Sequence, residues 1–479
     1  MLKIIVLLII DLIIAILLVC FAPLPADEGE GKTAYRGVVG DGGVVDCDAL
    51  LPSAASCSVS FSSKTRYSFT PFINEDRMSL NGCTASKLYI IFRHGTRYPG
   101  KNHIRRFDSI SEKLSNLSRS SGVVNKLRGW INPFLIEEHS HLSSIGRKEL
   151  YCLAKRFKQR YSGLFDEVYS PDSFSFASTH KKRCVKSALS FAEGLFDGLD
   201  LSNGGESIGL QIDDRSLRFF DNCKEYTNKS KRNESLEAVL NEFLFSDAIS
   251  KALREIQQQI DESKRFWIIN EHELLDMYQI CAMETANFGH SNWCSLFSYS
   301  SLQALEYYYD MKSYWTKGHG HTINWSISCH LINDIINSLS PSNPAKVTLR
   351  FAHAETLVPL LSALSLYKDD LHLLPSNYHV MSSERKFRVS KMAPFSGNLA
   401  FVVYRCTKEM IFVSDDHEDF VHVLSNEAPV TLDHSLCTGE GNGGNGGWCP
   451  LQSLPEIVRH VSDKLITYPC SLKDICIQA

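Results

Sequence analysis

Lys87-Leu-Tyr-Ile-Ile-Phe-Arg-His-Gly-Thr-Arg-Tyr-Pro-Gly100 is the stretch from which we predict the fold. It opens with Leu88–Phe92, an unbroken apolar run of strand length that has no polar face. Such a run is typical of a parallel strand that is covered on both faces. Charged residues follow it at once, so His94 is predicted at the carboxyl end of a strand, where open α/β sheets bind their ligands.

The residues around His94 favour phosphate chemistry. Arg93 and Arg97 flank the imidazole, and like charges disfavour its protonated form and lower its pKa. His94 is therefore expected to be neutral and nucleophilic, within a pair of guanidiniums that match phosphate oxygens. The alternative is a basic surface turn that follows a buried strand.

The heptapeptide Arg93–Pro99 resembles the signature of the histidine acid phosphatases, a family that includes phytases. The resemblance implies a covalent phosphohistidine intermediate on His94. It also implies that the rest of the chain supplies a third arginine, a second histidine and an acid.

The third arginine is predicted to be Arg183. Phe174 and Phe176 alternate as in a short strand, and a helical pattern follows, so Arg183 lies in a first helical turn beyond a strand end. A solvated helix arginine is the alternative. The match to the family's arginine helix implies that Arg183 binds the same phosphate as Arg93 and Arg97.

The second histidine and the acid are predicted to be His353 and Glu355. Val347–Ala352 is rich in strand-forming residues, and a helix is expected from Thr356 to Leu366. His353 would bind a phosphate oxygen, and Glu355 would protonate the leaving oxygen. Most of the family uses His-Asp here, whereas His-Ala-Glu resembles the multiple inositol polyphosphate phosphatase branch.

Lys317 is a candidate contact for an outer phosphate of the substrate. The segment Lys317–Asn324 resembles the Lys-Gly-x-Gly-x-x-Ile-Asn region of that branch, except that His319 replaces an expected aromatic residue. His319 and His321 are a weak metal signal, because no carboxylate or cysteine stands at ligand spacing. We expect no metal and no other cofactor.

The resemblance implies an α/β fold with a mainly parallel-sheet, phosphoglycerate-mutase-like core domain and an inserted helical cap domain. The expected division is a leader at 1–26, the first part of the core at 27–199, the helical cap at 200–340 and the second part of the core at 341–479. In the last part we predict strands at Asn398–Arg405, Met410–Val413 and Phe420–Leu424, and a helix at Leu454–Leu465. In the cap we expect helices at Leu236–Ile249 and Ala252–Ile260.

Three features predict the secretory pathway. Residues 1–26 combine Lys3 with an apolar stretch and then small residues, as in a signal peptide or, if uncut, a signal anchor. Of the 15 cysteines one lies in this leader, and the even remainder suggests disulfides. Their pairing cannot be read from sequence, although Cys437 and Cys449, and Cys470 and Cys476, lie close together. Glycosylation sequons stand at Asn116, Asn228, Asn233 and Asn324.

The predicted location is therefore extracellular, or membrane-anchored with the catalytic part outside, and the ER lumen stays open as a further location. A membrane contact is expected only if the leader is uncut, and no protein partner can be inferred. The formal net charge of −4 over 479 residues argues against a nucleic-acid binder, which would show a basic face.

The function expected from these residues is hydrolysis of a small-molecule phosphomonoester. The resemblance implies inositol polyphosphates such as phytate as substrates, with 2,3-bisphosphoglycerate as a further candidate. The alternatives are a general histidine acid phosphatase that acts on small phosphomonoesters, and an inactive phosphate-binding surface protein.

Overall fold

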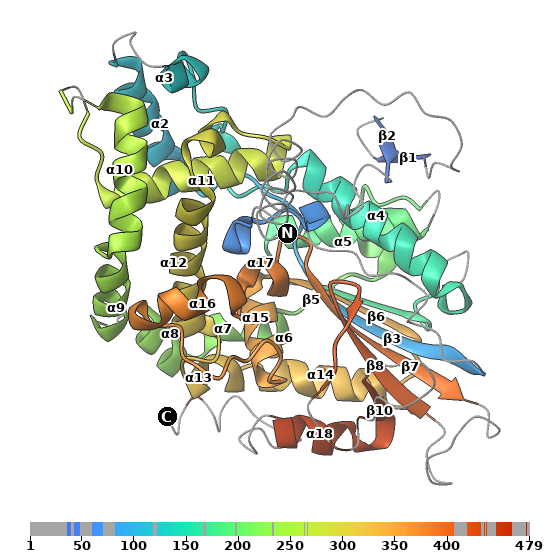
Figure 1. The fold of residues 1–479 in the computed structure, drawn as a ribbon. Coiled ribbons are helices and arrows are strands. Elements are labelled where there is room, and N and C mark those ends of the chain that lie inside the picture. Colours follow the sequence, from blue (N-terminus) through green and yellow to red (C-terminus); the bar gives the residue numbers. More distant parts are fainter. Residues whose placement is uncertain are drawn as a thin grey trace, which may run out of the picture.

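The computed structural model describes residues 36–39, 43–47, 60–69, 82–117, 122–165, 169–196, 199–231, 234–262, 264–265, 267–406, 419–432, 435, 437, 447–461 and 476. Within these residues the fold is built on one mixed sheet with the strand order β10-β8-β7-β3-β6-β4-β5 (Figure 1). Its strands are β3 (Cys83–Arg93), β4 (Phe174–Ser178), β5 (Gln211–Ile212), β6 (Val347–Ala352), β7 (Asn398–Cys406), β8 (Asp419–Ser425), β9 (Ala428–Pro429), which pairs with β8, and β10 (Trp448–Pro450). A separate hairpin joins β1 (Arg36–Val39) and β2 (Gly43–Asp46).

The sheet is parallel in one half and antiparallel in the other. β3, β6, β4 and β5 run parallel to one another. β7 pairs antiparallel with β3, and β8 continues the antiparallel half through to β10. The α/β fold class is confirmed, and the parallel half is the one that carries the predicted site residues.

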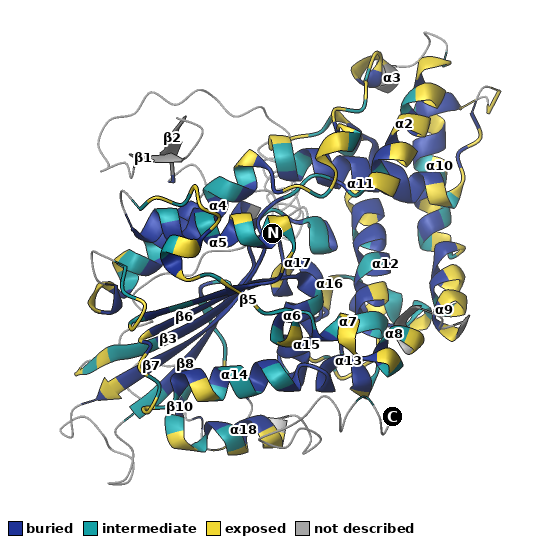
Figure 2. Cartoon of the chain, turned by 180° about the vertical axis from the view of Figure 1, so that it is seen from behind, coloured by how far each residue is buried: buried dark blue, intermediate teal, exposed yellow. Residues whose placement is uncertain are grey.

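Alternate residues of β3 are buried on opposite faces of the sheet, as its apolar run predicts. Leu88, Ile90 and Phe92 pack in one core with α4 (Ser144–Arg160) and α5 (Lys182–Leu195). Tyr89 and Ile91 belong to a second core. That core includes residues of α14 (Cys329–Leu339), α15 (Ala354–Ala363) and α18 (Leu454–Val461). The central strands are therefore mostly buried, β3 from Leu88 to its end (Figure 2).

The other helices form a layer beside the sheet, and many are buried on the side that faces their neighbours (Figures 1 and 2). They are α2 (Lys101–Ser115), α3 (Gly122–Leu127), α6 (Asp214–Leu217), α7 (Phe219–Asn222), α8 (Lys224–Lys231), α9 (Glu234–Leu244), α10 (Asp247–Asp261), α11 (Glu271–Phe288), α12 (Tyr299–Lys317), α13 (Thr322–Ser326), α16 (Tyr378–Glu384) and α17 (Val389–Met392).

Contacts across this layer join segments that are distant in the sequence. α2 packs against α11, and α3 packs against α10, so part of segment 27–199 lies among the helices of 200–340. α14, although it falls within 200–340, packs against β3. The domain bounds at residues 200 and 340 stay a prediction.

The predicted elements lie close to the observed ones. The expected strand Val347–Ala352 has the bounds of β6, and the expected terminal helix begins at Leu454 as α18 does. The expected helix Leu236–Ile249 is wrong, because α9 ends at Leu244 and α10 starts at Asp247, with an extended backbone at Ser246 between them. The predicted strand Met410–Val413 lies outside the described residues.

Disulfides tie distant elements together. The pairs are Cys47–Cys152, Cys83–Cys406, Cys223–Cys476, Cys281–Cys294 and Cys437–Cys449, and Cys329 is also disulfide-bonded. The neighbours Cys437 and Cys449 are indeed joined. Cys476, however, pairs with Cys223, and Cys184 is a free, buried thiol, so the even count does not mean that every cysteine is paired.

The sequon at Asn324 lies at a buried position. The residue is 2% exposed, and its side-chain amide donates hydrogen bonds to the carbonyls of Trp315 and Gly318, which argues against a glycan there. Asn116 and Asn228 are exposed, whereas Asn233 and the leader lie outside the described residues. No helix in the described part of the chain is long and apolar enough to cross a membrane.

Candidate active site

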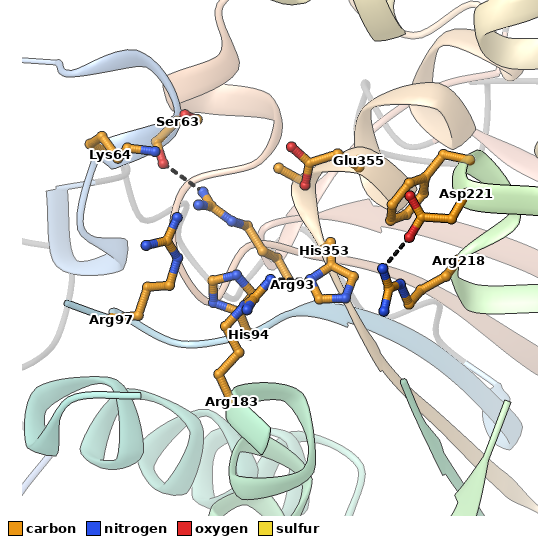
Figure 3. Close-up of a pocket in the computed structure, with 12 residues that line it drawn as sticks. Ser63, Lys64, Arg93, His94, Arg97, Arg183, Arg218, Asp221, His353 and Glu355 are labelled. Atoms are coloured by element: carbon orange, nitrogen blue, oxygen red, sulfur yellow. Dashed lines mark hydrogen bonds and ion pairs between the residues drawn. The ribbon is translucent and has the colours of Figure 1, made fainter. Parts of the chain in front are cut away.

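The predicted site residues meet at the carboxyl ends of three adjacent parallel strands. His94 follows β3, His353 and Glu355 follow β6, and Arg183 lies in the first turn of α5, after β4. A pocket opens where these strands end, and the side chains converge on it (Figure 3). It is lined by Ser63, Lys64, Arg93, His94, Arg97, Arg183, Arg218, Phe220, Asp221, His353, Ala354 and Glu355.

His94 is held as a neutral imidazole by its own loop. The residue is 3% exposed, and its Nδ1 lies 2.9 Å from the carbonyl oxygen of Gly95. A carbonyl only accepts hydrogen bonds, so Nδ1 carries the proton and the lone pair is on Nε2. Burial, followed by the charges of Arg183 and Arg93, lowers the pKa of His94 well below its usual range. This is the state that a nucleophilic imidazole requires.

The loop after His94 is fixed by Glu149 of α4. One carboxylate oxygen accepts from the backbone N–H of Thr96 at 3.0 Å and from the Ser396 hydroxyl at 2.8 Å. The other accepts from the Thr96 hydroxyl at 3.0 Å. Close backbone contact requires glycine in α4, since a Cβ on Gly146 would lie 2.1 Å from the Thr96 carbonyl oxygen. Sequence reasoning missed Glu149, which is buried in α4 between Gly146 and Leu150.

The three predicted arginines surround His94 without a carboxylate partner in the described part of the chain. Arg93 donates to the carbonyls of Ser63 at 2.8 Å and Ala393 at 2.7 Å, and burial lowers its pKa to about 9. Burial likewise lowers the pKa of Arg97 to about 10. Because none of the three forms a direct ion pair with a carboxylate of the described residues, these guanidiniums form a strong site for an anion.

His353 lies beside Arg183 at the end of β6. The Arg183 guanidinium is 3.3 Å from His353 Nδ1, and Thr179 Oγ1 is 3.1 Å from Nε2. Burial and then Arg183 lower the pKa of His353 to about 3. Since a guanidinium can only donate, Nδ1 accepts and the ring proton lies on Nε2.

Glu355 faces the pocket and is paired with Lys317. Lys317 Nζ donates to Glu355 Oε1 at 2.8 Å, and the Glu355 side chain is 44% exposed. Burial alone would raise the pKa of Glu355, but the Lys317 ammonium outweighs it and holds the pKa well below the usual range. Lys317 was predicted as a contact for an outer phosphate of the substrate. In the structure without substrate, its ammonium contacts the carboxylate of Glu355, the predicted acid.

Several pocket residues were missed by sequence reasoning: Ser63, Lys64, Arg218, Phe220 and Asp221. The first two lie on the short 3-10 helix Ser62–Lys64, and the others lie on α7 and the residue before it. Neither segment has the strand-then-helix pattern that identified the other site residues. Among the described residues no group of three or more His, Cys, Asp or Glu side chains could hold a metal ion.

Comparison with known proteins agrees with the family resemblance of the sequence motifs. The model of the histidine phosphatase superfamily (branch 2) matches residues 86–426. Multiple inositol polyphosphate phosphatase 1 of Gallus gallus is 31% identical over 81% of this chain and 89% of its own length. A thiamine-repressible acid phosphatase of Schizosaccharomyces pombe is 25% identical over 80% of this chain and 83% of its own length.

Solved structures show the same fold. The phytase from D. castellii superposes with a TM-score of 0.69 at 18% identity, covering 88% of this chain and 87% of that one. The multiple inositol polyphosphate phosphatase of Bifidobacterium longum, in complex with inositol hexasulfate, gives 0.64 at 16% identity, covering 83% of this chain and 97% of that one.

Proposed function

The chain belongs to the histidine phosphatase superfamily (branch 2), and we propose that it removes phosphate from inositol polyphosphates such as phytate through a phosphohistidine on His94. As a member of this family it is a phosphatase. The substrate class follows from the relatives named multiple inositol polyphosphate phosphatase and from the cationic pocket, and 2,3-bisphosphoglycerate is a further candidate.

In the first step Nε2 of His94 attacks phosphorus, and the bond from phosphorus to the ester oxygen breaks. Arg93, Arg97 and Arg183 hold the non-bridging oxygens, whose charge these donors stabilise. His353 donates to the phosphate once the negative charge of the bound substrate favours a second ring proton on its Nδ1, because in the free protein its only ring proton lies on Nε2 toward Thr179. The leaving oxygen takes a proton from Glu355. Because Glu355 is ionised beside Lys317, its proton must arrive with the substrate, whose phosphates offset the Lys317 charge.

In the second step water attacks the phosphohistidine. Its proton passes to Glu355, the P–N bond breaks, and His94 regains its lone pair as inorganic phosphate leaves. The carboxyl group that gave a proton in the first step is thus restored.

A single observation carries this mechanism. The hydrogen bond from His94 Nδ1 to the Gly95 carbonyl leaves the lone pair of Nε2 available, among three guanidiniums that form no direct ion pair with a carboxylate of the described residues. A histidine with only a structural role requires neither an available Nε2 lone pair nor nearby guanidiniums. A nucleophile that attacks a phosphate dianion requires both.

The test is release of inorganic phosphate from phytate, in the presence of a chelator, by the wild type and His94→Ala. Activity that survives chelation and is lost in the variant supports the proposal. The variant must keep the melting temperature of the wild type, so that loss of activity is not loss of fold. A wild type that spares phytate would contradict the proposed substrate.

The second candidate function is that of a general acid phosphatase, which the similarity to a yeast acid phosphatase favours. Wild-type turnover of small phosphomonoesters without turnover of phytate would establish it. Turnover of neither would favour an inactive phosphate-binding protein.

We propose the secretory pathway as the location, because the disulfides within the described residues suit an oxidising compartment. The expected partner is a small-molecule polyphosphate. The helical layer beside the pocket would cap that substrate, in line with the predicted division at residues 200 and 340.

A further inference from the structure

The ring of His353, which lies beside His94 in Figure 3, is held at both of its nitrogens. Its Nδ1 lies 3.3 Å from the guanidinium of Arg183, which lines the pocket. Its Nε2 lies 3.1 Å from the hydroxyl oxygen of Thr179, which is fully buried. Nδ1 therefore faces the pocket, and Nε2 faces the interior of the protein.

The hydroxyl of Thr179 is placed by the pairing of β4 with β6. Ser178, the last residue of β4, lies opposite Phe351 of β6. The backbone N–H of Thr179 donates to the Phe351 carbonyl at 3.2 Å, and its carbonyl accepts from the Ser178 hydroxyl at 3.0 Å. Because His353 follows β6 directly, the sheet sets the distance between the hydroxyl and the ring.

The thiol of Cys184 packs against the same ring from the first turn of α5. Its Sγ lies 3.7 Å from each ring nitrogen of His353 and donates to the Ala352 carbonyl at 3.2 Å. Burial raises the pKa of this thiol to about 11, so it keeps the proton that it donates. The Ala352 carbonyl also accepts from the backbone N–H of His94 at 3.0 Å. The thiol therefore links the ring of His353 to the backbone that carries His94.

These contacts decide which ring nitrogen meets a bound phosphate. A guanidinium only donates, so in the free protein the single ring proton is on Nε2 and is donated to the Thr179 hydroxyl oxygen. A second proton, taken up from the solvent when phosphate binds, then has only Nδ1 to occupy. Hydrogen bonds from a charged donor are stronger than those from a neutral one, so Thr179 also favours the doubly protonated ring.

We propose that Thr179 is a positioning residue, which keeps a proton on Nε2 of His353 and thereby presents Nδ1–H to the transferred phosphoryl group. Cys184 holds the ring in that orientation. The proposal rests on the proposed function and deepens it, since it assigns a part in the reaction to two buried side chains that are not among those lining the pocket. Thr179 acts only through His353 and needs no contact with the substrate.

The first test is kinetic, with p-nitrophenyl phosphate as the substrate. Thr179→Val keeps the shape of the side chain and removes the acceptor of the Nε2 proton. We expect kcat/KM to fall by about tenfold, because one hydrogen bond to a charged group is lost, and Thr179→Ser to restore most of it. Thr348→Val, the same change at a buried position of β6, should keep the wild-type value. An unchanged kcat/KM in a folded Thr179→Val protein would overturn the proposal.

A double-mutant cycle separates positioning from a merely structural role. If Thr179 acts through His353, Thr179→Val should cost nothing further in a protein that already carries His353→Ala. A loss as large as that in the wild-type background would overturn the proposal, since the hydroxyl would then act independently of the ring. Cys184→Ser keeps a donor to the Ala352 carbonyl and should lower kcat/KM less than Cys184→Ala does, and the reverse order would contradict the role of Cys184.

The ring protons are observable without any variant at Thr179. In protein with isotope-labelled histidine, the nitrogen NMR signals of His353 are those that His353→Ala lacks. We expect the wild type to carry one ring proton, on Nε2, when free, and a proton on each ring nitrogen when inorganic phosphate is bound. A free protein with its proton on Nδ1, or a bound ring with a single proton, would overturn the proposal. Failure of the proposed function is distinguishable, because a wild type that cleaves no phosphomonoester would contradict that function, whereas the position of the ring proton is measured without turnover.

Discussion

Lys317 and Glu355, a residue that lines the pocket, form an ion pair with Nζ 2.8 Å from Oε1. The lysine is the last residue of α12, and the glutamate lies in the first turn of α15, so the pair joins the helical layer to the sheet. Its consequence is chemical: the group proposed as the acid is ionised in the free protein. The protonation of Glu355 is thereby coupled to the arrival of negative charge.

Replacing Lys317 should change the pH dependence of the reaction. The ammonium lowers the pKa of Glu355, so in Lys317→Met the carboxyl group keeps its proton to higher pH. The alkaline limb of kcat/KM should therefore move to higher pH. Glycerol 2-phosphate is the suitable substrate, because its alkoxide must be protonated to leave and it has no outer phosphate for Lys317 to bind.

The matched control is Lys312→Met, which removes a charge from an exposed position on the same helix. The alkaline limb of its pH profile of kcat/KM should lie at the same pH as in the wild type. If both variants shift the limb equally, net charge and not the ion pair sets the protonation of Glu355.

The role of Glu355 predicts an effect that depends on the leaving group. General acid catalysis contributes on the order of 100- to 10,000-fold, so Glu355→Gln should lose about that much of kcat/KM on glycerol 2-phosphate. The loss on p-nitrophenyl phosphate should be smaller, because p-nitrophenolate is a weak base that leaves without a proton. Steady-state rates on the two substrates measure the difference.

The same variant should accumulate the phosphohistidine. The amide that replaces the carboxylate in Glu355→Gln cannot act as a base toward water, so with p-nitrophenyl phosphate the second step becomes slower than the first. A stopped-flow trace should then show a burst of p-nitrophenolate close to one equivalent of enzyme. Equal losses on both substrates, without a burst, would argue against Glu355 as the acid and base.

The sequence predicted the parts of the site that follow a strand. His94, Arg183 and His353 each come after an apolar or alternating run that is typical of a strand, and adjacent parallel strands bring their carboxyl ends together. The strand order that makes β3, β6 and β4 neighbours was not available from any local pattern. It depends on which faces pack together over the whole fold.

The missed residues share a physical reason. Lys64 and Arg218 reach the pocket from short irregular segments whose positions are set by partners distant in the sequence. Ser62, beside Ser63 in the same short helix, donates to Asp310 across 248 residues, and no spacing rule connects such a pair. Local patterns therefore identify the residues on regular elements, and tertiary contacts supply the rest.

Glu149 is expected to be essential for the geometry of the His94 loop. Its carboxylate accepts three hydrogen bonds, two from Thr96 and one from Ser396, and it is buried. Glu149→Ala leaves these donors without partners and should lower the free energy of unfolding by about 3 kcal/mol. Because the loop would also loosen, kcat should fall.

Glu149→Gln provides the discriminating comparison. Its amide oxygen can still accept from Thr96 but its NH₂ group cannot accept from a donor, so it should recover part of both the stability and kcat. Denaturant unfolding and kcat on one substrate measure the two quantities. A Glu149→Ala protein with wild-type kcat would show that the loop does not depend on this carboxylate.

His422 on β8 should make the protein less stable in acid. Its ring is fully buried against Trp448, and within the described residues neither nitrogen has a hydrogen-bond partner. Burial lowers its pKa from 6.5 to about 4. Between these two values the unfolded chain binds a proton that the folded chain does not, so stability falls as the pH decreases, by up to about 3 kcal/mol in total.

His422→Leu removes this proton uptake and keeps an apolar side chain against Trp448. Relative to the wild type, the variant should therefore gain melting temperature steadily as the pH is lowered from 7 to about 4. Groups common to both proteins cancel in the difference, and His379→Leu, at an exposed position of α16, controls for the loss of a histidine. If the difference between wild type and His422→Leu is the same at every pH, protonation of His422 does not limit the acid stability of this fold.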